Sequence, residues 1–342
     1  MSSEFDESRL DDPAILAESD HLLRPLAEAG ARLRREAAAA EAALASLAGE
    51  QRPRAIIAVG PEARLLRAVL EPVCPVPFVA WPNLGLPGWV GPLDLVIVLG
   101  GGSSAATCSH EALRRGSRVI VTAPEDSSLA RQSASRATTL LPVSTADPLP
   151  AAIVALAALH EMGLAGPIST AAVPDALDAV ALESGHGVDL AANPAKMVAI
   201  ELADAQPVIW GGSVLAARAS RRIAEAVRTA SGRVALAADA GELLPILAGV
   251  RPRDPFADPF EGSEEARPTL VVVDDGLGDA ENDEQRDALE ENARVMDVRV
   301  TALAHTVGST MERYATVLAK GMFAAAYLQI GLGREYRREG RL

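Results

Sequence analysis

This sequence is poor in aromatic and basic residues, and each shortage excludes a class of protein. Phe, Trp and Tyr make up 3% of the 342 residues, so few rings are available to stack on nucleic-acid bases. The 32 Lys and Arg residues face 46 Asp and Glu residues, and the resulting net charge of -14 repels a phosphodiester backbone. We therefore expect no nucleic-acid partner.

Long apolar runs and an export signal are also missing. No apolar stretch approaches the roughly 20 residues of a membrane-spanning helix, and the acidic start, residues 1–20, lacks the basic and apolar regions of a signal peptide. The two cysteines, Cys74 and Cys108, have neither metal-ligand spacing nor a pairing pattern. These features predict a cytoplasmic protein without a membrane partner, in which both thiols are buried.

The chain is rich in small and branched apolar residues. Hydrophobic residues make up 49% of it, which is enough for real cores, and its length predicts roughly two domains. Strand candidates such as Leu95–Leu99 are apolar throughout, as a sheet covered on both faces requires. We predict an α/β protein with two lobes, each a mainly parallel sheet flanked by helices, and with helical segments at both ends.

The pattern divides the chain into four segments. A helical segment at residues 1–49 precedes a first lobe at 50–165, inter-lobe helices occupy 166–205, and a second lobe with a C-terminal helix spans 206–342. The expected strands are residues 55–59, 76–80, 93–99 and 118–122 in the first lobe, and 207–210, 233–237, 269–273 and 298–303 in the second. A Gly/Ser turn follows a strand in each lobe, which suggests a duplication.

Two stretches carry a family resemblance. Asn193-Pro194-Ala195-Lys196 is followed by an apolar helix and then by Pro207–Gly211, while residues 94–121 run through a strand, a Gly/Ser turn, a helix and a returning strand. Both resemble the bifunctional phosphoglucose/phosphomannose isomerases of the sugar-isomerase (SIS) family. The resemblance implies two SIS lobes, a homodimer, and a hexose 6-phosphate ligand.

The Gly/Ser-rich turn from residue 101 to residue 107 is the strongest candidate site. Such a turn, leading into a helix, presents free backbone N–H groups to an anion. Ser103, Ser104 and Thr107 supply hydroxyls, while Gly101 and Gly102 allow a ligand to approach closely. A phosphate would fit there, and an ordinary turn with Ser103 as the helix cap explains the same residues equally well.

Two other turns are weaker candidates for the substrate site. Gly211, Gly212 and Ser213 are usable in the second lobe, although a helix start accounts for them better. The turn after the first strand carries Pro61, which lacks an N–H donor, and Glu62, which would repel phosphate. That turn therefore departs from the Gly- and Ser-rich pattern of the family.

Motifs for cofactors are missing. Neither GxGxxG nor a Walker motif is present, so we expect no nucleotide, and we expect no other cofactor and no metal. The acidic run at residues 274–284 lacks the register of an EF-hand. A solvated loop leading into a helix is the favoured interpretation of that run.

Aldose–ketose isomerisation needs a base and an acid that converge beside the reacting carbons. The family carries them on a segment rich in Asn, His and Glu, of which residues 237–245 keep only Glu242. His305 follows the last expected strand, at the edge where open α/β sheets bind ligands, and His186 lies in the inter-lobe loop. We take Glu242 and His305 as the catalytic candidates, although a surface carboxylate and a capping histidine are the commoner roles of such residues.

The leading hypothesis is a sugar-phosphate binding protein of this family, active on glucose 6-phosphate or mannose 6-phosphate if the catalytic residues converge. The alternative is a catalytically reduced SIS protein that senses phosphosugar or acts as a regulatory partner in sugar-nucleotide metabolism. The missing family histidine and the altered first turn favour the alternative.

Overall fold

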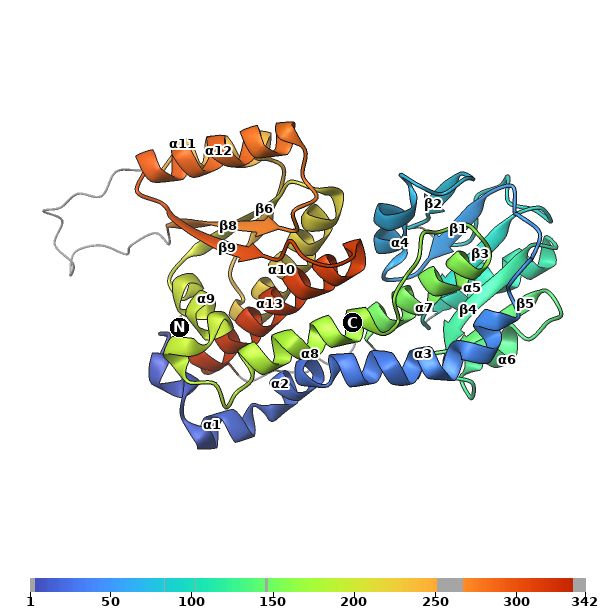
Figure 1. The fold of residues 1–342 in the computed structure, drawn as a ribbon, viewed down its shortest axis with the longest axis horizontal. Helices are drawn as coiled ribbons and strands as arrows, with labels where there is room; N and C mark the ends of the chain where they lie inside the picture. The colour runs from blue at the N-terminus through green and yellow to red at the C-terminus, as the bar shows by residue number, and fades with distance from the viewer. Residues whose placement is uncertain (1–3, 83, 102, 145–146, 251–266, 335–342) are drawn as a thin grey trace, which may run out of the picture. The chain divides into compact units, whose positions relative to one another are not determined.

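The structure is a computed structural model that describes residues 4–82, 84–101, 103–144, 147–250 and 267–334 (Figure 1). The chain forms two compact units, of which one contains residues 30–174 and the other contains residues 1–29 together with 175–342. Each unit is a parallel sheet flanked by helices, so the predicted fold class is confirmed. Within the described residues, no helix has the length and apolar character needed to cross a bilayer.

The unit of residues 30–174 is built on a five-stranded parallel sheet in the order β2-β1-β3-β4-β5. Its strands are β1 (Ile56–Val59), β2 (Phe78–Ala80), β3 (Leu95–Leu99), β4 (Arg118–Ala123) and β5 (Thr138–Pro142). Its helices are α3 (Ala29–Ala45), α4 (Ala63–Leu70), α5 (Ser103–Arg114), α6 (Ser128–Gln132) and α7 (Pro148–Glu161).

Both faces of this sheet are covered, which explains its apolar strands. All five residues of β3 are buried. Val96 and Val98 lie in one core cluster with Ala105 and Ala112 of α5. Because successive side chains of a strand point to opposite faces, the intervening residues face the other layer, where α7 contacts β3 and β4 and also packs against α4.

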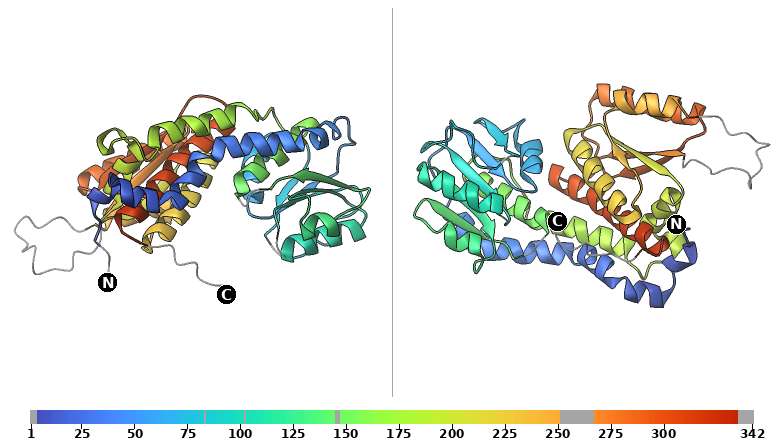
Figure 2. Two further views of the ribbon diagram at one scale, coloured as in Figure 1. Left: turned by 90° about the horizontal axis from the view of Figure 1, so that it is seen from below. Right: turned by 180° about the vertical axis from the view of Figure 1, so that it is seen from behind.

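The second unit is built on a four-stranded parallel sheet in the order β7-β6-β8-β9. Its strands are β6 (Gln206–Gly211), β7 (Leu236–Ala237), β8 (Pro268–Asp274) and β9 (Arg299–Ala304). Its longer helices are α8 (Ala172–Ser184), α9 (Pro194–Leu202), α10 (Val214–Ser231), α11 (Ala240–Ala248), α12 (Ala280–Val295) and α13 (Thr310–Gly331). Helices α10 and α13 pack together on one face of the sheet, and α11 and α12 pack together on the other (Figure 1 and Figure 2).

Each sheet has a point at which the chain leaves two neighbouring strands toward opposite faces. In the first unit these strands are β1, which leads into α4, and β3, which leads into α5. In the second unit they are β6, which leads into α10, and β8, which leads into α12. Open parallel sheets bind their ligands in the crevice at the carboxyl ends of such strands. We call these places the first and the second switch point.

The leading helical segment is divided between the two units. Its start, η1 (Glu7–Leu10), α1 (Pro13–Glu18) and α2 (Asp20–Ala27), belongs to the second unit, whereas residues from Gly30 onward belong to the first. Arg9 Nε donates a hydrogen bond of 2.7 Å to the Ile330 carbonyl, and Leu10 is fully buried. The units therefore divide the chain differently from the predicted boundary at residue 49.

Candidate functional site

The turn after β3, at the first switch point, is held by the neighbouring strand β4. Gly100 has a φ of 74°, and its N–H group donates to both the carbonyl and the hydroxyl oxygen of Thr122, each at 3.1 Å. A side chain at the next residue, Gly101, would meet no atom within 4 Å. The backbone at Gly100 is thus held to β4, and the backbone at Gly101 is open on one side, as a ligand needs.

The first turns of α5 carry two exposed residues with hydroxyl side chains. Ser104 and Thr107 are exposed, while the neighbouring Ala105 and Cys108 are buried in the core. Residues three apart lie on the same face of a helix, so Ser104 and Thr107 share one exposed face at the start of α5. Two predicted site positions, Gly102 and the side chain of Ser103, lie outside what the structure describes.

The turn after β1 approaches this site closely. Gly60 has a φ of 113°, and a side-chain carbon there would lie 2.1 Å from the carbonyl oxygen of Leu99. The next residues place Glu62 in the interior, where it is only 3% exposed. The carboxylate that the sequence suggested would repel phosphate is therefore packed inside the unit instead of projecting into solvent.

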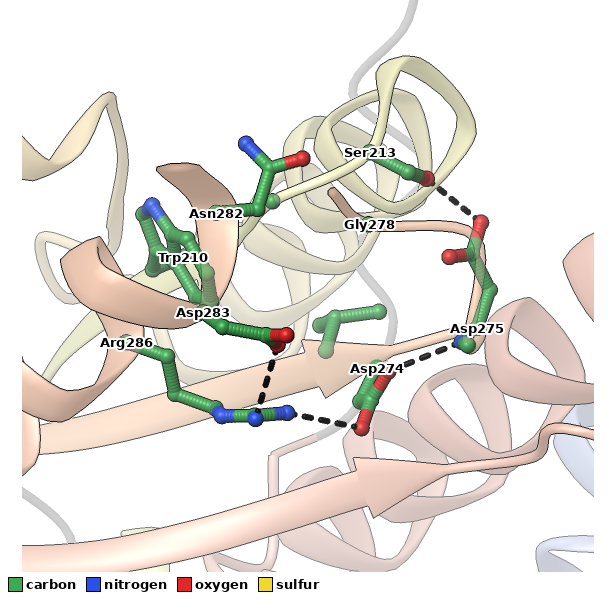
Figure 3. Close-up of a pocket in the computed structure, with 11 residues that line it drawn as sticks. Trp210, Ser213, Asp274, Asp275, Gly278, Asn282, Asp283 and Arg286 are labelled. Atoms are coloured by element: carbon green, nitrogen blue, oxygen red, sulfur yellow. Dashed lines mark hydrogen bonds and ion pairs between the residues drawn. The ribbon is translucent and has the colours of Figure 1, made fainter. Parts of the chain in front are cut away.

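A cavity of about 190 Å³ lies at the second switch point. It is bordered by the carboxyl ends of β6 and β8, the turns that follow them, and the first turns of α12 (Figure 3). The polar and aromatic side chains at its wall include Trp210, Ser213, Asp274, Asp275, Asp283 and Arg286. The acidic run that the sequence favoured as a solvated loop thus forms one wall of a pocket.

Ser213 is fully engaged by its own unit. Its hydroxyl caps α10 by accepting from the Ala216 N–H at 2.9 Å, and it donates to Asp275 Oδ2 at 2.6 Å. Asp275 is 1% exposed and also accepts from the Leu277 N–H at 3.1 Å. A carboxylate therefore stands beside the hydroxyl that would have to face a phosphate, which disfavours anion binding at this turn.

The two glycines of this turn are required by packing. A side-chain carbon at Gly211 would lie 2.4 Å from the backbone carbon of Ala216, and one at Gly212 would lie 2.8 Å from the Trp210 ring. Both distances are below any normal contact. These glycines allow α10 to begin close to the sheet, which is the role as a helix start that the sequence favoured.

Arg286 bridges two carboxylates at the opposite side of the cavity. Its guanidinium lies 3.3 Å from Asp274 Oδ2 and 2.9 Å from Asp283 Oδ1 (Figure 3). With Asp275, the wall holds three carboxylates and one guanidinium, so negative charge is in excess. Arg313 lies outside the wall and donates to the backbone carbonyls of Asp275 and Gly276 at 3.2 and 3.3 Å.

The structure does not bring Glu242 and His305 together within their unit. Glu242 lies exposed in the first turn of α11, which follows β7, and His305 follows β9. These strands are the two edges of the sheet, three strand spacings apart, or about 14 Å at about 4.8 Å per spacing. Neither residue lines the cavity.

The remaining histidine candidate, His186, and one of the two cysteines, Cys108, make hydrogen bonds within the protein. The backbone carbonyl of His186 accepts from Lys196 Nζ at 3.4 Å. Cys108 is buried, and its thiol, whose pKa is raised by burial, donates to the Gly85 carbonyl at 3.1 Å. Cys74 is only partly buried because it lies just past the end of α4, so the prediction of two buried thiols is wrong for Cys74. Among the described residues, no group of three or more His, Cys, Asp and Glu is placed to hold a metal.

Comparison with protein families finds a match for the second unit. Residues 191–335 match the model for the bacterial phospho-glucose isomerase C-terminal SIS domain. The match covers less than half of the 342 residues and leaves the first unit unmatched. No curated protein matches the sequence.

Solved structures resemble nearly the whole chain. Tagatose-6-phosphate ketose/aldose isomerase from Escherichia coli has a TM-score of 0.65 at 14% identity, covering 91% of this chain and 92% of that one. The C-terminal domain of glucosamine-fructose-6-phosphate aminotransferase from Francisella tularensis has a TM-score of 0.61 at 12% identity, and the match covers 91% of this chain and 96% of that one. A glucose-6-phosphate isomerase like protein from Thermus thermophilus has a TM-score of 0.55 at 17% identity, and the match covers 94% of this chain and 92% of that one. At these identities the likeness shows a shared fold.

Proposed function

We propose that this chain, whose residues 191–335 belong to the bacterial phospho-glucose isomerase C-terminal SIS domain family, binds a hexose 6-phosphate at its first switch point. The observation that carries the proposal is the start of α5, where the open backbone at Gly101 precedes the exposed residues Ser104 and Thr107. The structural relatives include proteins named as sugar-phosphate isomerases, which supports the same ligand class.

Elementary electrostatics favours an anion at this position. The N-terminus of an α-helix carries about half a positive charge and unsatisfied N–H groups, and a phosphate accepts from both N–H and hydroxyl donors. α5 is 12 residues long and points this end toward the open turn. By contrast, the three carboxylates at the second switch point would repel a phosphate.

A charge placed at the start of α5 tests the proposal. Like charges about 4 Å apart repel by about 4 kcal/mol at an effective dielectric constant of 20, so Ser104→Asp should weaken glucose 6-phosphate binding more than about 100-fold. His110→Asp places the same charge on an exposed position farther along α5 and should leave the affinity nearly unchanged. Calorimetric titration measures both variants, and equal affinities of Ser104→Asp and the wild type would refute the site.

The separation of Glu242 from His305 favours the second candidate function, a catalytically reduced phosphosugar sensor or regulatory partner. An anion site needs only N–H groups and hydroxyls, whereas isomerisation also needs an acid and a base at the reacting carbons. Three strand spacings lie between these two residues in the second sheet. Glucose 6-phosphate or mannose 6-phosphate isomerisation, in a cytoplasmic homodimer, remains the alternative that the family suggests.

A further inference from the structure

We propose that a groove between α2, α10 and α13 of the second unit binds residues 335–342, which follow Arg334 in the same chain. The groove has a volume of about 340 Å³, within the roughly 300–1,000 Å³ that ligand pockets occupy. Its apolar side chains are only half-buried, and covering them would remove apolar surface from water. They are Leu22, Leu26, Ala226, Met322 and Ala326.

The chain turns beside this groove at the end of α13. Gly333 has a φ of 60°, and the Arg334 N–H donates to the Gln329 carbonyl at 3.2 Å. This combination is a Schellman cap, which ends a helix and redirects the chain. The side-chain amide of Gln329 also donates to the Arg334 carbonyl at 3.2 Å, and Gln329 lines the groove. Arg334 is therefore held at the groove wall.

The position of Arg334 also fixes the end of the groove from which the segment starts. A side-chain carbon at Gly232, which follows α10, would lie 2.2 Å from the guanidinium of Arg334. The C-terminal ends of α10 and α13 thus lie together. From that end the groove extends along α10 from Ala230 to Arg222, about 12 Å at 1.5 Å per residue. Residues 335–342 span about 26 Å when extended, so they are long enough to cover it.

The segment carries side chains that match the groove wall. Tyr336 is the second residue after Arg334, about 7 Å along an extended chain, and Ala226 lies about 6 Å, or four residues, before the end of the groove. Arg338 lies on the same side of an extended chain as Tyr336. Glu225, which also lines the groove and is 57% exposed, offers it a carboxylate. The ring thus covers the apolar floor while the guanidinium pairs at the rim.

The attachment favours the segment of the same chain over a second copy. A short flexible tether holds its free part at an effective concentration of about a millimolar or more. Arg334 is such a point of attachment, and it lies beside the groove. A second copy at micromolar concentration would therefore compete poorly for the same surface.

Nitration of Tyr336 by tetranitromethane in the full chain tests whether the groove covers the ring. Tyr314 and Tyr327 are fully buried, so Tyr336 is the tyrosine that reports on the segment. Ala226→Gln/Ala326→Gln fills the groove from both helices and should raise the nitration rate of Tyr336 at least about tenfold, because protection depends on the closed state.

A matched control places the same side chains elsewhere. Ala39→Gln/Ala42→Gln changes two exposed positions of α3 in the first unit and should leave the nitration rate of Tyr336 unchanged. Equal rates in the wild type and in Ala226→Gln/Ala326→Gln would overturn the proposal.

Disulfide trapping then locates the segment and identifies its chain. In a Cys74→Ala background, Thr229→Cys at the exposed groove wall and Arg337→Cys should form an intramolecular disulfide on mild oxidation. Glu284→Cys with Arg337→Cys should not, because α12 packs on the other face of the sheet. A disulfide that joins two chains, or equal yields in the two pairs, would overturn the proposal. Neither measurement uses a sugar phosphate, so both are independent of the site at α5.

Discussion

Lys196 offers a sharp test of how the N-terminal segment is held in the second unit. Its ammonium is fully buried and donates to Asp11 Oδ1 at 2.6 Å and to the Val188 carbonyl at 2.8 Å. The Tyr327 ring lies 5.6 Å from the same nitrogen. Asp11 itself is 47% exposed on its side chain. The two partners of this ion pair therefore differ greatly in their access to water.

This asymmetry predicts that removing the carboxylate of Asp11 lowers the free energy of unfolding more than removing the amine of Lys196. Asp11→Ala leaves a buried ammonium with only neutral acceptors. Breaking a buried ion pair lowers the free energy of unfolding by about 3–5 kcal/mol. Because Asp11 is half exposed, we discount this loss to about 2–3 kcal/mol. Lys196→Met keeps the volume of the side chain and removes the buried charge. The lost hydrogen bonds are then offset because the desolvation cost of the buried ammonium also disappears. We expect a cost below about 1.5 kcal/mol.

Urea unfolding measures both variants in a Trp81→Phe/Trp89→Phe background, where Trp210 reports on the second unit alone. The double variant Asp11→Ala/Lys196→Met should be more stable than Asp11→Ala. Asp20→Ala, which removes an exposed pair with Arg24, should cost only a few tenths of a kcal/mol. A larger loss in Lys196→Met than in Asp11→Ala would refute the reasoning.

The pH dependence follows from the same pair. The hydrogen bond from Lys196 lowers the pKa of Asp11 below its ordinary value. A lowered pKa in the folded state means that the contribution to stability is fully present above the unfolded pKa and is lost as pH falls through the folded pKa. Between about pH 5 and pH 2, Asp11→Asn should therefore lose less stability than the wild type in the same assay.

Two further predictions concern activity and assembly. Conversion of fructose 6-phosphate should be weak or absent in the wild type and unchanged in Glu242→Gln and His305→Ala, because these side chains follow opposite edges of the sheet; fast turnover that either substitution abolishes would contradict this. Sedimentation at micromolar concentration should show a homodimer, as the family resemblance suggests, and a species of only 35.6 kDa would count against it.

The local pattern of the sequence was enough to predict the fold class and most strands. Residues 93–99 were expected as a strand because they are apolar throughout, and β3 occupies Leu95–Leu99 with every side chain buried. β5 was missed because Thr138–Pro142 is only partly buried, begins with two threonines and ends in proline. It is an edge strand, and edge strands carry a weaker hydrophobic signal. The glycine turn before α5 could likewise be predicted, because glycines and residues with hydroxyl side chains are adjacent in the sequence.

The tertiary structure alone decided which distant residues meet. Asp275, in a run expected to be solvated, is buried, and Ser213, 62 residues away, donates to it; the two border one cavity. Lys196 and Asp11 pair across 185 residues. Glu242 and His305 stay apart because the order of the strands sends the chain to opposite edges of one sheet. Hydrophobic periodicity specifies which face of a strand or helix is buried, but these contacts depend on strand order and register, which periodicity does not contain.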